Sequence, residues 1–230
     1  MGSEALWPEA VIFDLDGTLA DTVLDLAAAL NRTLAELDLP PHPPEAVRTM
    51  VGGGLAKLLD RGLASQGATL DREAMSRAGQ RLFDHYAARP AMHSSLYPGT
   101  ATALGALREA GVALGICTNK PDAIARELLQ ALGLTHAFGF VQGWEGMAKK
   151  PDPAGMRRVL QELGAAPSAS FMVGDSVTDV ETACAAGLAG VILVSYGYTA
   201  IPARALGADA VIDRLDELPG ALARLATTKS

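Results

Sequence analysis

Short apolar segments rich in β-branched residues recur along the chain, and helical patterns separate them. In one such pattern Ile124, Leu128 and Leu132 follow each other at four-residue intervals, which is typical of a helix that buries one face. Near-continuously apolar strands that alternate with helices predict a parallel sheet covered on both faces. We therefore expect an α/β protein with a Rossmann-like parallel sheet, and strands at 10–13, 112–118, 138–142, 170–173, 190–194 and 210–212.

The region between about residue 20 and residue 92 interrupts this alternation. It contains amphipathic helix patterns and no convincing strand, and the Pro-rich turn at 39–45 and the glycine run at 52–54 separate the helices. This indicates a helical subdomain inserted after the first strand. The predicted organisation is a discontinuous α/β core, residues 1–19 and 93–230, with a helical cap at 20–92.

The first predicted strand ends in an acidic motif, VIFDLDGTLAD, at 11–21. Ligands collect at the carboxyl ends of parallel strands, and the alternation of side chains points Asp14 and Asp16 to the same side. Two such close carboxylates repel each other unless a cation or a shared proton intervenes. The motif therefore favours a metal site with one ionised nucleophile and one proton carrier, followed by a turn at Gly17 and Thr18. The structural alternative is a capped surface turn, which does not need two acids after an apolar strand.

A second acidic motif, FMVGDSVTDVETA, lies at 171–183. Asp175 stands at the end of a predicted strand, and Asp179 lies four residues on, where a helix should begin, so both can face one point. Hard oxygen ligands of this kind suit Mg²⁺. Taken alone, the motif could equally be a helix N-cap with an acid in the first turn. Together with the first motif it predicts a magnesium site.

Two further elements follow predicted strands. Thr118, Asn119 and Lys120 come at the end of one strand, and Lys150 precedes a Pro-x-Pro segment on a stiff loop. An isolated threonine or lysine is usually a surface residue. Their order in the chain, however, brings these side chains to the same sheet edge as the acids. We expect Lys120 to help attract a phosphate dianion there.

In this order the four motifs resemble those of the haloacid dehalogenase superfamily, in the branch with a helical cap between the first two motifs. The match spans essentially the whole chain, with DxDGT at Asp14, then Thr118, Lys150, and GDSxxD at Asp175. The resemblance implies that Asp14 attacks phosphorus and forms an aspartyl phosphate. It implies that Asp16 protonates the leaving alkoxide and then activates water, that Thr118 holds a phosphoryl oxygen, and that Lys150 neutralises charge.

The same resemblance implies a Mg²⁺ ion held by Asp14, Asp175 and the main-chain carbonyl of Asp16. The supporting residues that it implies are Asn119, Asp179, Gly17, Thr18 and Ser176.

Finer features resemble phosphoglycolate phosphatases, namely RTMVGGGL at 48–55, TNKP at 118–121, KPDP at 150–153 and YGY at 196–198. They imply hydrolysis of a small phosphate monoester, with 2-phosphoglycolate as the first choice. A phosphatase for another small sugar phosphate or for pyrophosphate, and a β-phosphoglucomutase-like phosphomutase, remain alternatives, because they share the machinery and differ in the cap. The candidate substrate-binding residues are Gly52, Gly53, Gly54 and Lys120, and any one of Arg48, Lys57 and Arg61 could contact a substrate carboxylate.

Composition argues against other classes of protein. A net charge of −7 without a Lys/Arg cluster argues against nucleic-acid binding. No apolar run reaches the roughly 20 residues that span a bilayer, and the N-terminus lacks the pattern of a secretory signal. The glycine run lacks the G-x-G-x-x-G pattern of dinucleotide sites, and the retained acids argue against a catalytically inactive regulator.

The remaining expectations concern setting and partners. The two cysteines, Cys117 and Cys184, lie among apolar or small residues and are expected to be buried, which makes a reducing, cytoplasmic setting the default. The expected partner is a small phosphorylated metabolite, with no nucleic acid and no membrane. We expect the chain to be a monomer or a homodimer.

Overall fold

A six-stranded parallel sheet forms the core of the structure, a computed structural model that describes residues 7–228. Residues 1–6 and 229–230, which the predicted core includes, lie outside the described residues. The expected α/β fold is confirmed, and every predicted strand is present with its ends shifted by no more than two residues. The order across the sheet is β5 (Phe140–Gln142), β4 (Ala113–Cys117), β1 (Ala10–Phe13), β6 (Ser170–Gly174), β7 (Gly190–Val194) and β8 (Ala210–Ile212).

Strand β1 lies at the centre of the sheet, between β4 and β6. Phe13, its last residue, is aligned with Ile116 of β4 and Val173 of β6. This register brings the residues after the three strands to one edge of the sheet. Asp14 continues the ladder through its backbone N–H, which donates to the carbonyl of Val173 at 2.9 Å.

Helices cover both faces of the sheet, as the apolar strands require. Val11 and Phe13 of β1 belong to one hydrophobic cluster, whereas Ala10 and Ile12 belong to the cluster on the other face. The first cluster includes residues of α5 (Thr100–Glu109), α6 (Asp122–Ala131) and α9 (Leu218–Thr228), and the second includes residues of α7 (Ala154–Leu163) and α8 (Val177–Ala186). Short 3-10 helices lie in the connections, at Pro167–Ala169, Ala203–Ala205 and Leu215–Glu217. No helix between residues 7 and 228 is long and apolar enough to cross a membrane.

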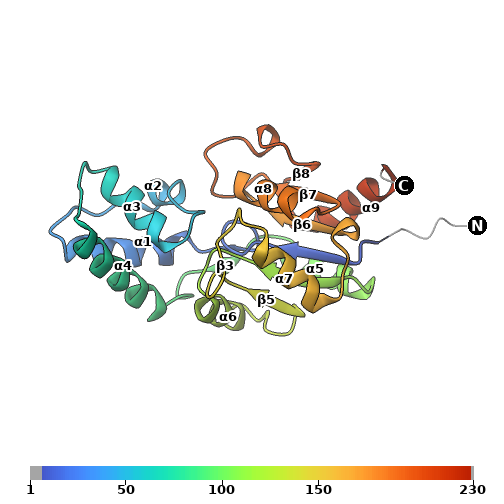
Figure 1. Cartoon of the computed structure of the whole chain (residues 1–230), viewed down its shortest axis with the longest axis horizontal. Coiled ribbons are helices and arrows are strands. Elements are labelled where there is room, and N and C mark those ends of the chain that lie inside the picture. Colours follow the sequence, from blue (N-terminus) through green and yellow to red (C-terminus); the bar gives the residue numbers. More distant parts are fainter. Residues whose placement is uncertain (1–6, 229–230) are drawn as a thin grey trace, which may run out of the picture.

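The helices inserted after β1 form a separate layer, which Figure 1 shows in blue and teal at the opposite end of the molecule from the chain termini. They are α1 (Val23–Ala35), α2 (Pro44–Arg48), α3 (Leu55–Ala64) and α4 (Arg72–Ala87), and their buried apolar side chains share one hydrophobic cluster. Ile124 of α6 and Tyr198 from the loop after β7 also belong to this cluster, so the cap packs on the core through them. The domain boundaries at 19/20 and 92/93 stay a prediction.

A two-stranded antiparallel ladder joins the cap to the core. It pairs β2 (Ala20–Asp21) with β3 (Ser95–Leu96), where the chain leaves the sheet and where it returns. The sequence predicts no strand at Ala20, and that prediction is wrong. A two-residue strand is too short to leave a periodic pattern, and its partner lies more than 70 residues away.

The two cysteines differ from each other in their surroundings. Cys117 at the end of β4 is buried, as expected, whereas Cys184 on α8 is exposed. The expectation for Cys184 was wrong because α8 turns its neighbour Ala183 into the core. A helix rotates by about 100° per residue, so the next position faces solvent.

Candidate active site

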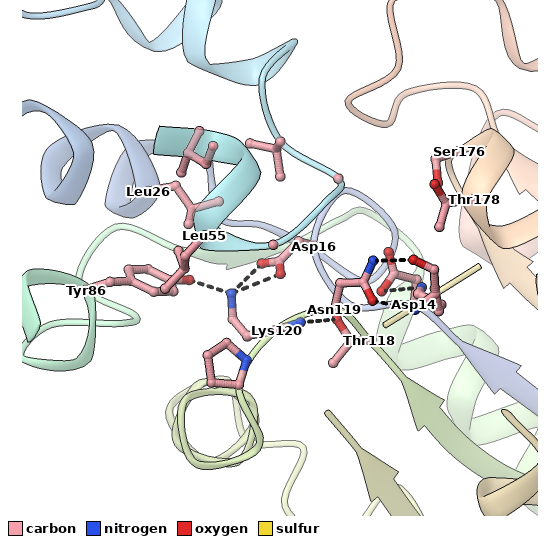
Figure 2. A pocket seen from close by; sticks show the side chains of 16 residues that line it. Asp14, Asp16, Leu26, Leu55, Tyr86, Thr118, Asn119, Lys120, Ser176 and Thr178 are labelled. Atoms are coloured by element: carbon pink, nitrogen blue, oxygen red, sulfur yellow. Dashed lines mark hydrogen bonds and ion pairs between the residues drawn. The ribbon is translucent and has the colours of Figure 1, made fainter. Parts of the chain in front are cut away.

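A pocket lies between the carboxyl edge of the sheet and the cap (Figure 2). Its free volume is about 40 Å³, and its two walls differ in character. The core supplies the polar wall, which consists of Asp14, Asp16, Thr118, Asn119, Lys120, Pro121, Lys150, Ser176 and Thr178. The cap supplies the largely apolar wall, which consists of Leu26, Val51, Gly52, Gly54, Leu55, Leu58 and Tyr86.

Asp14 shares a buried lysine with Asp179. Lys150 Nζ lies 3.0 Å from Asp14 Oδ1 and 2.6 Å from Asp179 Oδ1. The contact with Asp14 is an ion pair without a well-directed hydrogen bond, since no hydrogen-bond donor of good geometry reaches Asp14 Oδ1 in the described part of the chain. Burial raises the pKa of Asp14 to about 6, although the Lys150 ammonium acts in the opposite direction. Lys150 therefore holds Asp14 in place, and the Asp14 carboxylate can still bind a further ligand through its oxygens.

Asn119 fixes the backbone that carries Lys150. Its side-chain Oδ1 accepts from the Lys150 N–H at 2.8 Å, and its Nδ2 donates to the Lys150 carbonyl at 3.2 Å. All these groups are buried. Asn119 therefore links the end of β4 to the loop that carries Lys150, and this link positions the Lys150 ammonium beside Asp14.

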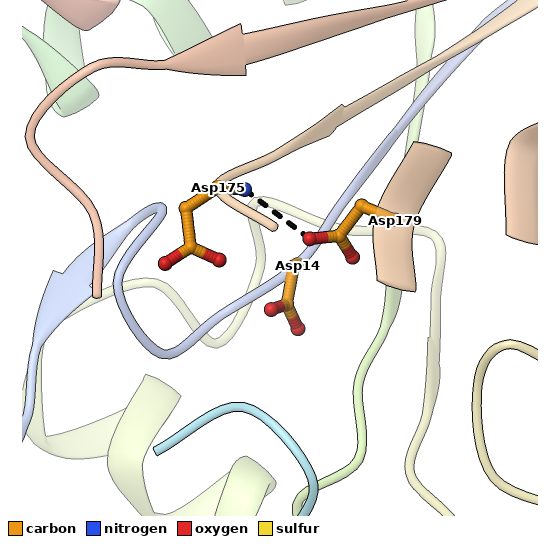
Figure 3. Close-up of side chains that lie close together, drawn as sticks. All are labelled: Asp14, Asp175 and Asp179. Carbon is orange, nitrogen blue, oxygen red and sulfur yellow. Dashed lines mark hydrogen bonds between the residues drawn. The ribbon is translucent and has the colours of Figure 1, made fainter. Parts of the chain in front are cut away.

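Asp179 lies in the first turn of helix α8 and closes the loop that carries Asp175. Its Oδ2 accepts from the backbone N–H groups of Asp175 and Ser176 and from the Ser176 hydroxyl. With Ser176 it forms a capping box, so the helix-cap alternative is correct for this pair. The same residue also belongs to a cluster of acids: carboxylate oxygens of Asp14, Asp175 and Asp179 lie within 4.8 Å of one another (Figure 3).

This acidic cluster fits a divalent cation. It contains three carboxylates and one ammonium, Lys150, so its formal charge is −2 when every group is ionised. Burial, with repulsion from Asp179 and Asp14, raises the pKa of Asp175 well above its usual range. Both oxygens of Asp179 already have partners. Asp14 and Asp175 each keep one oxygen without a bond to any residue in 7–228, which leaves these two acids available for Mg²⁺.

Glycines allow the backbone to pack directly against Asp175. Gly17 has φ +85°, and a Cβ at this position would lie 2.5 Å from Asp175 Oδ2. A Cβ on Gly197 would lie 2.2 Å from Asp175 Cβ. The N–H of Tyr198, next in the chain, donates to Asp175 Oδ2 at 2.6 Å. The turn after Asp16 and the loop after β7 therefore enclose this carboxylate from two sides, and a side chain at either glycine would push it away.

Asp16 has a lysine of its own. Lys120 Nζ lies 2.7 and 2.9 Å from the two Asp16 oxygens and 2.6 Å from the hydroxyl of Tyr86 (Figure 2). The Thr22 hydroxyl donates to Asp16 Oδ1 at 2.6 Å. From the sequence, Lys120 is expected to attract a phosphate dianion. The structure gives it a more specific environment, between the second acid of the first motif and a cap tyrosine.

Two threonines of the motifs, Thr18 and Thr118, are buried. Thr118 Oγ1 accepts a long hydrogen bond, 3.3 Å, from the Lys120 N–H, which leaves the hydroxyl hydrogen free to donate to a ligand oxygen. Thr18 Oγ1 has no hydrogen-bond partner among residues 7–228. Thr118 lines the pocket, whereas Thr18 lies in the turn after Asp16.

The glycine loop contributes only part of its length to the pocket. Gly52 and Gly54 line it, but Gly53 lies on a neighbouring groove beside Lys57. The two arginine candidates have other partners. Arg48 forms an ion pair with Asp21 at 2.7 Å, and Arg61 donates to the carbonyls of Met50 and Val51. Arg48 thus holds β2 of the ladder between cap and core, which we call the hinge, and Arg61 holds the glycine loop. None of the three candidate cations lines the pocket.

Tyr86 and Thr22 are site residues that the sequence analysis missed. Tyr86 belongs to the apolar stripe of its helix, where a tyrosine is indistinguishable from a core residue. Thr22 directly precedes helix α1 and resembles an ordinary cap, although its hydroxyl bonds Asp16. For Tyr86 the only sequence signal of a role in the site is a polar hydroxyl within an otherwise apolar helix stripe.

Comparison with known proteins agrees with this geometry. Residues 11–193 match the family model of haloacid dehalogenase-like hydrolases. The chain belongs to this family. This hydrolase is 47% identical over 211 residues to a phosphoglycolate phosphatase of Rhodospirillum rubrum. The aligned part covers 90% of this chain and 87% of that relative. It is 44% identical over 219 residues to a phosphoglycolate phosphatase of Caulobacter vibrioides, and this alignment covers 95% of this chain and 92% of that relative. A crystal structure described as a predicted phosphoglycolate phosphatase of Haemophilus somnus superposes with a TM-score of 0.85 at 29% identity, covering 93% of this chain and 97% of that one.

Proposed function

We propose that this hydrolase is a Mg²⁺-dependent phosphatase that converts 2-phosphoglycolate to glycolate and phosphate. The observation that carries the proposal is the pairing of two acids from one strand end with two different buried lysines in one pocket. Asp14 has Lys150, and Asp16 has Lys120. Such separate environments suit two acids with separate roles. The phosphoglycolate phosphatases at 44% and 47% identity support the choice of substrate.

In the first half-reaction a carboxylate oxygen of Asp14 attacks phosphorus, and the bond between phosphorus and the glycolate oxygen breaks. The leaving oxygen takes a proton from Asp16. An aspartyl phosphate is then left on Asp14. Lys150, 3.0 Å from Asp14 Oδ1, offsets the negative charge on the reacting oxygens, and the Thr118 hydroxyl donates to a phosphoryl oxygen.

In the second half-reaction Asp16, now ionised, takes a proton from a water molecule. The water oxygen attacks phosphorus, the bond between phosphorus and Asp14 breaks, and inorganic phosphate is released. Both acids return to their starting states. Lys120 and the Thr22 hydroxyl hold the Asp16 carboxylate in one orientation for both proton transfers.

The Mg²⁺ ion would be held by Asp14 and Asp175, with the main-chain carbonyl of Asp16 as the third protein ligand. When bound, it neutralises charge on the transferring phosphoryl group. Asp179 acts on this site indirectly, because it bonds the N–H of Asp175 and the ammonium of Lys150. The cofactor assignment rests on the fit of the acidic cluster and on the family.

The alternatives, namely a phosphatase for another sugar phosphate or for pyrophosphate and a phosphomutase, share the core residues and differ at the cap wall, where Leu26, Leu55 and Leu58 line the pocket. The relatives at 44% and 47% identity favour 2-phosphoglycolate over these alternatives. The monomeric or homodimeric state and the cytoplasmic location stay predictions.

The proposed function is tested by phosphate release from a panel of substrates with Mg²⁺. The panel contains 2-phosphoglycolate, glucose 1-phosphate, glucose 6-phosphate, pyrophosphate and a phosphate-ester analogue without a carboxylate. We expect 2-phosphoglycolate to have the highest kcat/KM and EDTA to abolish turnover. A higher kcat/KM for a sugar phosphate would overturn the substrate assignment and leave the phosphatase class intact. Full activity in EDTA would remove the metal from the proposal.

Mg²⁺ is expected to raise the melting temperature of the metal-free protein, and to do so more at pH 8 than at pH 5. Protons compete with the metal for Asp14, whose pKa is raised to about 6, so the carboxylate is available to the metal mainly above that pH. At about 100 times its dissociation constant a ligand stabilises by about 2.7 kcal/mol, or roughly 5–10 °C for a chain of this size. Differential scanning fluorimetry with and without Mg²⁺ measures the shift. An equal shift in an Asp175→Asn variant would show that Mg²⁺ binds elsewhere.

A further inference from the structure

The cap wall of the pocket carries one polar side chain. Leu26, Val51, Leu55 and Leu58 are apolar, and the two glycines of this wall offer only backbone. Tyr86 is the exception among the described cap residues that line the pocket. Its side chain comes from α4, is fully buried, and points from the cap towards the core acids (Figure 2). An apolar wall with a single hydroxyl is the usual arrangement of a site that recognises one polar feature of a small ligand.

The hydroxyl of Tyr86 has an unused hydrogen. Lys120 Nζ donates to this oxygen at 2.6 Å, and an ammonium has donors only, so the tyrosine is the acceptor in this bond. No acceptor for its own hydrogen lies within bonding distance among residues 7–228. Burial raises the pKa of Tyr86 above its ordinary value, so the hydrogen stays in place at neutral pH. The phenol therefore presents a donor at the pocket wall, with a cation directly behind it.

The position of this donor is set by Asp16. Lys120 bonds both oxygens of Asp16 and the oxygen of Tyr86, so the three side chains form one row (Figure 2). In the proposed reaction Asp16 meets the leaving oxygen of the substrate. A group attached one carbon beyond that oxygen would then lie beside Lys120 and Tyr86. In a phosphorylated 2-hydroxy acid that group is the carboxylate.

Lys120 is one of the two lysines among the described residues that line the pocket. Lys150 is the only other lysine in the lining, and its ammonium is engaged by Asp14 and Asp179. Arg48 is paired with Asp21 at the hinge, and Arg61 is bonded to the glycine loop. Lys120 is paired with Asp16, but in the proposed reaction Asp16 carries a proton when the substrate binds, so the Lys120 charge is then uncompensated and can attract a carboxylate.

We propose that Tyr86, backed by Lys120, binds the carboxylate of the substrate and so selects short phosphorylated hydroxy acids over neutral phosphate monoesters. The Tyr86 hydroxyl donates a hydrogen bond to a carboxylate oxygen, and the Lys120 ammonium supplies the opposite charge. This inference rests on the proposed function and goes beyond it, because it assigns the selection to two named residues. Tyr86 is a specificity-determining residue in this account, and it takes part in no bond-making step.

The test compares two substrates on the full-length protein with Mg²⁺. They are 2-phosphoglycolate and ethyl phosphate, which has the same phosphate and two carbons but no carboxylate. The measured quantity is the ratio of their kcat/KM values in the wild type, in Tyr86→Phe and in Tyr97→Phe. Tyr97 is the matched control, because it is a tyrosine near the hinge that does not line the pocket. We expect the Tyr86→Phe ratio to fall by about 10- to 100-fold and the Tyr97→Phe ratio to stay at the wild-type value.

The outcomes separate the inference from the proposed function. If Tyr86→Phe lowers kcat/KM equally for both substrates, Tyr86 only positions Lys120, and the inference is overturned. It is also overturned if the ratio is unchanged in Tyr86→Phe, or if Tyr97→Phe shifts the ratio as much. A wild-type ratio near one would overturn the proposed substrate and the inference together. A high wild-type ratio that survives in Tyr86→Phe would overturn the inference alone.

Discussion

The Asp14→Asn variant is expected to lose on the order of 10⁴-fold or more in kcat for phosphate release. An amide is a poor nucleophile for phosphorus, and the change keeps the size of the side chain. No burst of phosphate and no covalent phosphoryl-enzyme should form in a single-turnover experiment. Asp60→Asn, on the exposed side of α3, is the matched control and should keep wild-type turnover. A purified Asp14→Asn variant with more than about 1% of wild-type kcat would overturn the nucleophile assignment.

The same variant is expected to be more stable than the wild type when both are free of metal at pH 8. The pKa of Asp14 is raised from 3.8 to about 6 by burial, so the folded state resists ionisation of this group more than the unfolded state does. Ionised Asp14 therefore costs stability once the pH exceeds about 6, and the cost is absent below about 4. Asparagine removes it, which corresponds to about 3 kcal/mol in the free energy of unfolding at pH 8. Urea unfolding at pH 8 in EDTA measures this, and a less stable variant there would contradict the explanation.

Lys150→Met is expected to lower activity severely and, unlike Asp14→Asn, to destabilise the fold. The ammonium is buried between Asp14 and Asp179, and its removal leaves both carboxylates without their counter-charge. Breaking a buried pair in this way costs about 3–5 kcal/mol, or roughly 6–20 °C in the melting temperature of a chain of this length. Without this cation near the phosphoryl group, kcat/KM should fall by on the order of 10³-fold. Thermal unfolding and phosphate release on one preparation measure both effects.

Lys149→Met is the matched control for this experiment, because it makes the same change one position earlier. The Lys149 ammonium lies 4.5 Å from the centroid of the Trp144 ring and forms no ion pair with Asp14 or Asp179. We expect this variant to keep most of its stability and activity. If Lys150→Met melted at the wild-type temperature, the buried ion pairs would not be a source of stability, and the role of Lys150 would be confined to catalysis.

The sheet was predictable because its strands carry their own signal. Segments such as Ala10–Phe13 and Gly190–Val194 are buried on both faces, so they are apolar at every position. The antiparallel pair β2 and β3 was not predictable, because each strand has two residues. Its stability depends on a partner far away in the chain. Cys184 was misjudged for a related reason, since small neighbours in the sequence do not show which face of α8 is turned inward.

The acids of the site were predictable, whereas their partners were not. Asp14, Asp16 and Asp175 follow apolar strands, and the parallel arrangement alone brings strand ends together. The ion pair between Lys120 and Asp16, however, joins residues 104 positions apart, and the bond from Lys120 to Tyr86 spans 34 positions. In the sequence Tyr86 is one more residue of an apolar stripe. Only the contact of Tyr86 with Lys120 across the boundary between cap and core makes it part of the pocket.

The sequence by itself determined the alternation of strands and helices, the position of each acid at a strand end, and hence the family and the class of chemistry. These are local properties, since strand burial and strand termination depend on residues that are neighbours in the chain. The tertiary structure alone decided which lysine pairs with which acid, that Gly53 turns away from the pocket, and that one cap hydroxyl faces the core. These depend on how the cap packs against the sheet edge, and residues distant in sequence meet there only after the chain has folded.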